Sequence, residues 1–220
     1  MWVHSIFESI SGEAGGIPQG TWCTFIRLQG CNLNCTWCDS PDARAKESAK
    51  MMFIPLLHDI LDILEKMGNL NILITGGEPL LQGETQGLIY LLIKKGYQVQ
   101  VETNGSYRIP YAVVPTYLRH LLHWVVDYKC PSSCMQKRME AFKFIIPVNS
   151  IVKFVIEDTT DLLFAIDRIE ELGLKNYTLS PLHGHGENIP KYVDILKKRN
   201  PDVLNNSFFS VQIHKLVNLP

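Results

Sequence analysis

Three cysteines lie within eight residues of one another, at Cys31, Cys35 and Cys38. Thiolates are soft ligands that suit zinc ions and iron–sulfur clusters, and a short loop with three of them can hold one face of a compact cluster. In a four-iron cubane, three thiolates leave the fourth iron open, which suits a cofactor or substrate rather than a closed structural site. The alternative is a zinc ion completed by Cys23, Cys130 or a histidine. The spacing favours the cluster, because structural zinc sites usually show paired Cys-x-x-Cys segments.

The remaining cysteines, Cys23, Cys130 and Cys134, are expected to be reduced thiols. Cys130 and Cys134 could serve part of a second cluster, but two ligands are too few to hold one. The chain has six cysteines and no recognisable leader, which favours metal ligands and free thiols over a disulfide framework, because the cytosol keeps thiols reduced.

A glycine-rich segment, Gly76-Gly77-Glu78-Pro79, follows an apolar run that ends at Thr75. Glycines let a backbone approach a ligand closely, and the Glu78 carboxylate can receive an ammonium group. Taken alone, the segment is equally typical of a strand-to-helix turn. It becomes informative only together with the cysteine loop.

Arg27 and Ser40 flank the cysteine loop. Arg27 carries a planar, charged fork that matches a carboxylate, and its alternative role is a surface salt bridge. Ser40 offers a hard oxygen of the kind that Mg²⁺ prefers, and its alternative role is in a helix cap or turn. Both residues are candidates for substrate and metal contacts.

Apolar patterns along the chain predict alternating strands and helices. Strands are predicted at residues 22–28, 70–75, 98–102, 123–127, 151–156, 177–180 and 208–213. Helices are predicted at residues 53–67, 88–95, 111–121, 160–172 and 189–198. The alternation indicates right-handed βαβ units. The predicted fold class is α/β, a partial, open (β/α) barrel with about six parallel strands, whose reactive groups collect at the carboxyl ends of the strands.

Length and composition limit the possible functions. A chain of 220 residues that is 46% hydrophobic can bury one substantial core, so a single domain over residues 1–220 is expected. Lys and Arg total 21 against 22 for Asp and Glu, with no basic run, which argues against a nucleic-acid partner and favours a small-molecule substrate. No apolar stretch approaches the roughly 20 residues that span a bilayer, and the first residues lack a signal-peptide pattern. A cytoplasmic protein without a membrane partner is expected.

The cysteine spacing, with the aromatic Trp37 just before Cys38, closely resembles the signature loop of the radical S-adenosylmethionine superfamily. The resemblance implies that the open iron of a [4Fe-4S] cluster binds the methionine part of S-adenosylmethionine. It implies that an electron, supplied by a reductant such as flavodoxin or ferredoxin, then cleaves this cofactor to a 5′-deoxyadenosyl radical. It also implies that the glycine-rich segment holds the amino group of the cofactor.

Motifs over nearly the whole chain resemble one family of that superfamily, the 7-carboxy-7-deazaguanine synthases. They lie at residues 11–13, 25–31, 37–40, 75–79, 102–105 and 212–215. The resemblance implies contraction of 6-carboxy-5,6,7,8-tetrahydropterin to 7-carboxy-7-deazaguanine with loss of ammonia, a step toward queuosine and other 7-deazapurines. It also implies a homodimer that uses Mg²⁺.

The same resemblance implies roles for individual residues. Metal ligands are Cys31, Cys35 and Cys38 for the cluster and Ser40 for Mg²⁺. Cofactor contacts are Trp37, Cys38, Asp39, Gly77, Glu78, Asp127, Tyr128, Lys129, Ser180, Pro181, Leu182 and His183. Substrate contacts are Ile10, Ser11, Gly12, Arg27, Thr75 and the final carboxylate of Pro220. The family usually has Gln where this chain has Ser11, which shortens one substrate contact.

Two other functions remain open at this level. Small activases that abstract hydrogen from a glycine of a partner protein carry the same cysteine spacing, but they need an open docking face rather than a carboxylate clamp such as Arg27. A non-catalytic iron–sulfur or zinc protein would have no use for the segment from Gly76 to Pro79, and a closed cluster site would have a fourth cysteine.

Overall fold

The structure is a computed structural model that describes residues 1–136, 147 and 149–220. Its strands are β1 (Trp2–Ile10), β2 (Trp22–Leu28), β3 (Met52–Phe53), β4 (Asn71–Gly76), β5 (Gln98–Thr103), β6 (Leu122–Tyr128), β7 (Ser150–Ile156), β8 (Tyr177–Pro181) and β9 (Phe208–Phe209). Its α-helices are α1 (Pro41–Arg44), α2 (Leu57–Met67), α3 (Glu84–Lys94), α4 (Thr159–Leu172), α5 (Ile189–Arg199), α6 (Pro201–Asn205) and α7 (Ile213–Leu216). Short 3₁₀ turns are η1 (Pro79–Leu81), η2 (Tyr111–Val113), η3 (Thr116–Leu121), η4 (Pro131–Ser133) and η6 (Gly186–Asn188).

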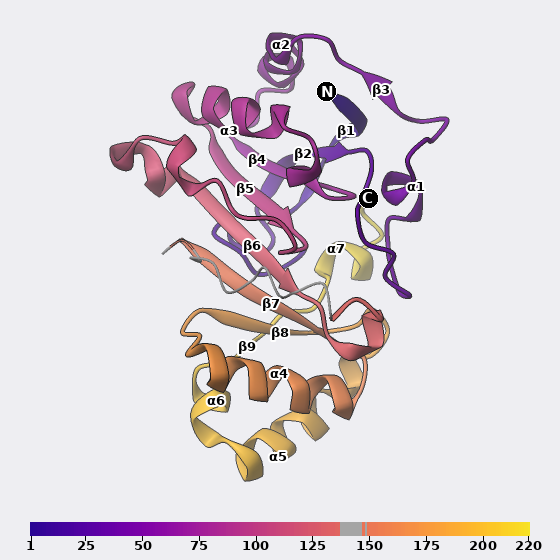
Figure 1. Cartoon of the computed structure of the whole chain (residues 1–220), viewed down its shortest axis with the longest axis vertical. Coiled ribbons are helices and arrows are strands. Elements are labelled where there is room, and N and C mark those ends of the chain that lie inside the picture. Colours follow the sequence, from indigo (N-terminus) through magenta and orange to yellow (C-terminus); the bar gives the residue numbers. More distant parts are fainter. Residues whose placement is uncertain (137–146, 148) are drawn as a thin grey trace.

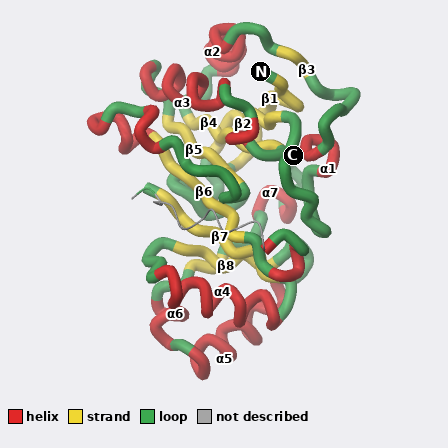
Figure 2. The backbone as a smooth tube through the Cα atoms, viewed as in Figure 1, coloured by secondary structure: helices red, strands yellow, loops and turns green. Residues whose placement is uncertain are grey.

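The described strands form one open sheet in the order β3-β1-β2-β4-β5-β6-β7-β8-β9. Along the series β2-β4-β5-β6-β7-β8-β9 each strand is parallel to the next, while β1 is antiparallel to both β2 and β3. Helices α2 and α3 lie toward one end of the curved sheet and α4, α5 and α6 toward the other, as Figures 1 and 2 show. The predicted α/β fold, a partial and open β/α barrel, is confirmed. None of the helices in the described ranges is long and apolar enough to cross a membrane.

Side chains alternate between the two faces of the parallel strands. On β6, Trp124 and Val126 are buried in the main apolar core together with residues of the helices. Their neighbours Val125 and Asp127 point to the opposite face, where they line a cavity. The outer face of the sheet, which carries Trp124 and Val126, therefore packs in the core. The inner face, which carries Val125 and Asp127, lines the cavity.

The structure differs from the predicted elements mainly where a proline or a tertiary contact determines the backbone conformation. The helix predicted over residues 111–121 is wrong: two 3₁₀ turns occupy this stretch, because Pro115 lacks an N–H and holds Val114 in an extended conformation. The last strand stops at Phe209, since the chain then turns toward the N-terminal segment, where the Ile213 N–H donates to the Gly12 carbonyl at 3.1 Å. The antiparallel strands β1 and β3 were not predicted.

Candidate active site

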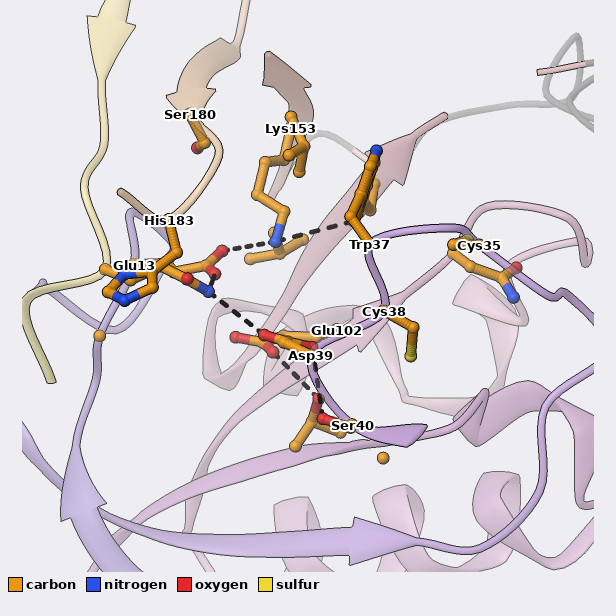
Figure 3. Close-up of a pocket in the computed structure, with 18 of the residues that line it drawn as sticks. Glu13, Cys35, Trp37, Cys38, Asp39, Ser40, Glu102, Lys153, Ser180 and His183 are labelled. Carbon is orange, nitrogen blue, oxygen red and sulfur yellow. Dashed lines mark hydrogen bonds and ion pairs between the residues drawn. The ribbon is translucent and has the colours of Figure 1, made fainter. Parts of the chain in front are cut away.

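A cavity of about 450 Å³ lies at the edge of the sheet where the parallel strands end. The cysteine loop, the loops after β4 and β5, the segment after β8 and the C-terminal residues line it, and Figure 3 shows its polar side chains. Six neighbouring parallel strands each place a polar side chain on its wall, in strand order Arg27, Thr75, Glu102, Asp127, Lys153 and Ser180. The carboxyl ends of the strands thus supply the reactive groups, as this fold class predicts.

All three cysteines of the triplet line this cavity. The Sγ atom of Cys31 accepts hydrogen bonds from the Leu33 N–H at 3.4 Å and from Nδ2 of Asn104 at 3.6 Å. Burial raises the pKa of the Cys31 and Cys35 thiols, and the positive charge of Lys129 opposes this effect. Because N–H donors and a nearby cation both stabilise a thiolate, the loop provides what metal-bound sulfur requires.

The cysteine triplet is not arranged as a site for a single metal ion. Among residues 1–136, 147 and 149–220, no three His, Cys, Asp or Glu side chains converge on a point that could hold one metal ion. A zinc ion needs four ligands within about 2.3 Å of one centre, whereas the irons of a cubane spread the sulfurs that bind them. The described residues therefore offer no preformed site for a zinc ion, and the case for a cluster rests on the cysteine spacing in the sequence.

The glycines after β4 permit a close approach of two backbones. A Cβ atom on Gly76 would lie 2.2 Å from the carbonyl oxygen of Leu28, and one on Gly77 would lie 2.0 Å from that of Gly30. Hydrogen bonds follow from this approach: the Gly77 N–H donates to Leu28 and the Glu78 N–H to Gly30. Any side chain at these two positions would separate the end of β4 from the start of the cysteine loop.

Glu78 is completely buried and lies outside the cavity lining. Its carboxylate accepts hydrogen bonds from the Leu80 N–H at 2.9 Å, the Thr103 hydroxyl at 2.8 Å and the Asn104 N–H at 2.7 Å. Burial raises the pKa of this carboxyl, although the three donors favour the charged form. In this geometry Glu78 positions Asn104 next to Cys31, and its predicted contact with the cofactor stays a prediction.

Buried ion pairs cross the opposite wall of the cavity. The Lys153 ammonium lies 2.5 Å from Glu13 and 3.8 Å from Asp127, and the Lys129 ammonium lies 2.7 Å from Asp127. Burial alone would lower the pKa of both lysines, but the neighbouring carboxylates raise it above the ordinary value. Both lysines therefore stay charged, and Lys129 also lies over the Trp37 ring, 5.1 Å from its centroid.

Four buried polar atoms on the cavity lining have no hydrogen-bond partner among the described residues. They are Nε of Arg27, Oδ1 of Asp127, Oγ of Ser180 and Nδ1 of His214. Buried polar groups in proteins are almost always satisfied, and an unsatisfied one costs free energy. Donors and acceptors left open around one cavity indicate that a polar ligand completes them.

The C-terminal segment closes one side of the cavity. Lys215 forms an ion pair with Asp39 at 3.3 Å, and the Gln212 amide donates to Glu13 at 2.7 Å. The hydroxyl of Ser9 donates to the carbonyl oxygen of Pro220 at 2.8 Å. The C-terminal segment therefore contacts both the N-terminal segment and Asp39, next to the cysteine loop.

The structure brings most of the predicted site residues to this cavity. Those that line it are Gly12, Arg27, Cys31, Cys35, Trp37, Cys38, Asp39, Ser40, Thr75, Gly77, Asp127, Lys129, Ser180, Pro181, Leu182, His183 and Pro220. Those that do not are Ile10, Ser11, Glu78 and Tyr128. The hydroxyl of Ser11 faces the carbonyl oxygens of Glu13 and Ile17, and Tyr128 packs in the outer core against Phe154. The contacts predicted for these four residues remain predictions.

Several lining residues had no predicted role. They are Glu13, Arg44, Glu102, Asn104, Lys153, Gln212, His214 and Lys215. Lys153 carried a usable signal, because it is a charged residue inside an otherwise apolar strand, whereas Glu102 follows the alternating polar pattern of β5 and gave a weaker one. A charge on the inner face of such a strand needs a partner or a ligand. Arg44 carried no such signal, since its position above the loop depends on the turn after Ser40.

Comparisons with known proteins agree with this geometry. Residues 25–124 match the Radical SAM superfamily. The 7-carboxy-7-deazaguanine synthase of Clostridium acetobutylicum is 35% identical over 219 residues, which cover 96% of this chain and 93% of the relative. The enzyme of the same name from Methanospirillum hungatei is 34% identical over 223 residues, covering 100% of this chain and 86% of the relative. The chain belongs to the 7-carboxy-7-deazaguanine synthase family. The crystal structure of QueE from Escherichia coli shares the fold, with 22% identity, a TM-score of 0.67 and coverage of 96% and 93%.

Family membership makes this chain a radical S-adenosylmethionine enzyme of 7-deazapurine biosynthesis. The family uses a [4Fe-4S] cluster and S-adenosylmethionine, and the cavity fits both, since it joins three cysteines to a wall of unsatisfied donors and acceptors. The activase alternative is not favoured.

The assignment of cluster ligands can be tested by iron content. After anaerobic reconstitution the protein should bind about four irons per chain, and Cys31→Ala, Cys35→Ala or Cys38→Ala should lose most of this iron, because each removes a thiolate ligand. Iron and acid-labile sulfide are the quantities to measure. The buried Cys130 and the exposed Cys134 serve as controls. Loss of iron in Cys130→Ala or Cys134→Ala equal to that in the triplet variants would contradict the assignment.

Glu102 should make stability depend on pH. Burial raises its pKa to about 7, with a further contribution from the negative charge of Glu13. The unfolded chain releases this proton near pH 4.3, so between about pH 4.3 and 7 the folded state binds more protons and becomes less stable as the pH rises. In urea unfolding of cluster-free protein, Glu102→Gln should gain stability over the wild type from pH 5 to pH 7.5. The exposed Glu65→Gln controls for the loss of one carboxylate, and a constant difference between Glu102→Gln and wild type would contradict the expectation.

Proposed function

We propose that this chain converts 6-carboxy-5,6,7,8-tetrahydropterin to 7-carboxy-7-deazaguanine with release of ammonia. One observation carries the proposal: the cysteine triplet and the half-buried Arg27, whose Nε is buried and lacks a hydrogen-bond partner, face the same cavity of about 450 Å³. A carboxylate on the substrate would satisfy Arg27, and a site beside the cysteines would receive the cofactor. When bound, the cluster and S-adenosylmethionine would supply the radical that starts the reaction.

The residues of the chain would bind and orient these groups. Cys31, Cys35 and Cys38 would hold the cluster. The cofactor would lie against Trp37, Asp39 and Gly77 on one side and against Asp127, Lys129 and residues 180–183 on the other. The unsatisfied atoms of Asp127 and Ser180 support this placement, because each offers an open hydrogen-bonding position on that wall.

The substrate would lie between Arg27, Thr75 and the segment at Gly12. Glu102 accepts a hydrogen bond from the Thr75 hydroxyl at 3.0 Å, and its raised pKa lets its carboxyl hold or release a proton near neutral pH. The C-terminal segment that ends at Pro220 would limit the access of water from one side.

Further features belong to the same proposal. We expect a Mg²⁺ ion bound by Ser40, a homodimer, and an electron donor such as flavodoxin or ferredoxin. We also expect residues 1–220 to act as one radical-SAM domain in the cytoplasm.

An anaerobic assay tests the proposed reaction. The reconstituted protein is mixed with S-adenosylmethionine, a reductant and 6-carboxy-5,6,7,8-tetrahydropterin, and 5′-deoxyadenosine and 7-carboxy-7-deazaguanine are measured by mass. Both products are expected to depend on the pterin. Cofactor cleavage without 7-carboxy-7-deazaguanine would overturn the proposed substrate.

Replacement of Arg27 should affect the substrate far more than the cofactor. Arg27→Lys keeps the charge but loses the planar fork that binds a carboxylate through two hydrogen bonds, and a hydrogen bond to a charged group contributes about 1.5–3 kcal/mol. The KM for the pterin should therefore rise by more than tenfold, while binding of S-adenosylmethionine changes little. Arg199→Lys, an exposed arginine paired with Asp167, is a matched control. Equal loss of affinity for both ligands would make Arg27 a structural residue.

The Mg²⁺ site can be tested through Ser40. If its hydroxyl binds a metal that orients substrate oxygens, added Mg²⁺ should stimulate turnover while uncoupled cleavage of S-adenosylmethionine responds much less. Ser40→Ala should reproduce the Mg²⁺-free rates in the presence of Mg²⁺, and Ser40→Thr, which keeps the hydroxyl, should remain active. Normal turnover of Ser40→Ala, together with no effect of chelators on turnover, would show that Ser40 binds no Mg²⁺.

A further inference from the structure

The turn η4, which follows β6, is bonded to the middle of the cysteine loop. The Thr36 N–H donates to the carbonyl oxygen of Ser133 at 3.3 Å, and the Thr36 hydroxyl donates to the carbonyl oxygen of Ser132 at 2.5 Å. The indole N–H of Trp37 donates to the hydroxyl of Ser132 at 2.9 Å. Thr36 and Trp37 are the two residues between Cys35 and Cys38. Both therefore take their position from η4.

Ser132 is held in turn by a buried carboxylate on α4. Oδ1 of Asp161 accepts from the Ser132 N–H at 3.0 Å, and Oδ2 accepts from the Ser132 hydroxyl at 2.5 Å. Oδ2 also accepts from the Glu157 N–H at 3.0 Å, at the end of β7. Asp161 is fully buried, so its orientation is determined by these three donors.

The chemistry of the three groups is consistent along the chain of hydrogen bonds, since the indole N–H of Trp37 can only donate. A serine hydroxyl has one proton, and an ionised carboxylate can only accept, so Ser132 donates to Asp161. The remaining lone pairs of the hydroxyl can then only accept, and Trp37 is the donor. With Ser132 at its edge and Lys129 over its face at 5.1 Å, the indole has one favoured orientation. Figure 3 shows Trp37 with its indole nitrogen directed away from Cys38, Asp39 and Ser40.

We infer that Ser132 and Asp161 are positioning residues, which orient Trp37 and the segment between Cys35 and Cys38 for the binding of S-adenosylmethionine. Neither residue lines the cavity, so both act only through the cysteine loop. The inference rests on the proposed function for the identity of the cofactor, but it does not depend on the pterin substrate.

The first test compares Ser132→Ala with wild type in three measurements. In the holoenzyme these are the KM for S-adenosylmethionine in uncoupled cleavage and the change in the EPR spectrum of the reduced cluster when S-adenosylmethionine is added. In cluster-free protein the third is the NMR signal of the Trp37 indole N–H, assigned with Trp37→Phe. Leaving the part-buried indole N–H without its acceptor should raise the KM about tenfold. The EPR change and the position of the indole signal should also differ from wild type, whereas Ser132→Thr, which keeps the hydroxyl, should restore all three.

A matched control separates positioning from general stability. Ser207→Ala removes another serine hydroxyl, one that donates to the carbonyl oxygen of Val203 at 2.6 Å, and neither residue lines the cavity. It should leave the KM, the EPR change and the indole signal at wild-type values. If Ser207→Ala alters them as much as Ser132→Ala does, the role of Ser132 is structural and the inference is overturned.

A double-variant comparison tests the route through Trp37. In a Trp37→Phe background the indole N–H is absent, so Ser132→Ala should cause no further rise in the KM. A full additional rise would overturn the inference. Asp161→Asn should resemble Ser132→Ala, and the serine variants decide the question if that protein does not fold. Failure of the pterin assay with normal cleavage of S-adenosylmethionine would reject the proposed substrate and leave this inference standing.

Discussion

The carboxylate of Glu78 is the interaction on which the cysteine side of the cavity depends. It is completely buried, and three donors from η1, from the end of β5 and from the loop that follows are required to hold it there. One of those donors belongs to Asn104, whose side chain reaches Cys31 and Asn32. A buried acceptor left without donors would be costly, so the two loops cannot move apart without losing several hydrogen bonds at once. Close contact of Gly76 and Gly77 with the start of the cysteine loop completes this wall.

The opposite wall is stabilised by charge instead of backbone contact. Lys153 lies between Glu13 and Asp127, and so links the N-terminal segment to β6 and β7. A buried ammonium is tolerated only when acids compensate for the loss of water, and here two of them do. The same network leaves Oδ1 of Asp127 open toward the cavity, while Nε of Arg27 remains open on another wall. The ion pairs thus balance most of the charge on this wall, while the open atoms of Asp127 and Arg27 remain available to a polar ligand.

Sequence patterns were sufficient for the parallel core of the fold because apolar strands and amphipathic helices alternate there with clear periodicity. They also located the cysteine triplet, Arg27 and the glycine-rich segment, whose chemistry is readable from residue type and spacing. They were insufficient for β1, which pairs antiparallel with β2 and does not alternate simply in burial. They also could not give the direction of a side chain. Whether Ser11 or Tyr128 faces the cavity depends on the register of its segment, and both face away.

The cysteine loop has little regular structure of its own, so its shape must come from its two flanks. Without a cluster, burial raises the pKa of Cys31 and Cys35, and the thiols are then neutral near pH 7. Neutral thiols do not attract iron ions as thiolates would, so charge does not organise the loop before the cluster binds. Cluster binding must also release the thiol protons. Hydrogen bonds from Asn104 on one flank and from the loop to Ser132 on the other can hold it open in this state. A loop prearranged in this way loses less conformational entropy when metal binds. The smaller entropy loss partly offsets the free-energy cost of deprotonating the buried thiols.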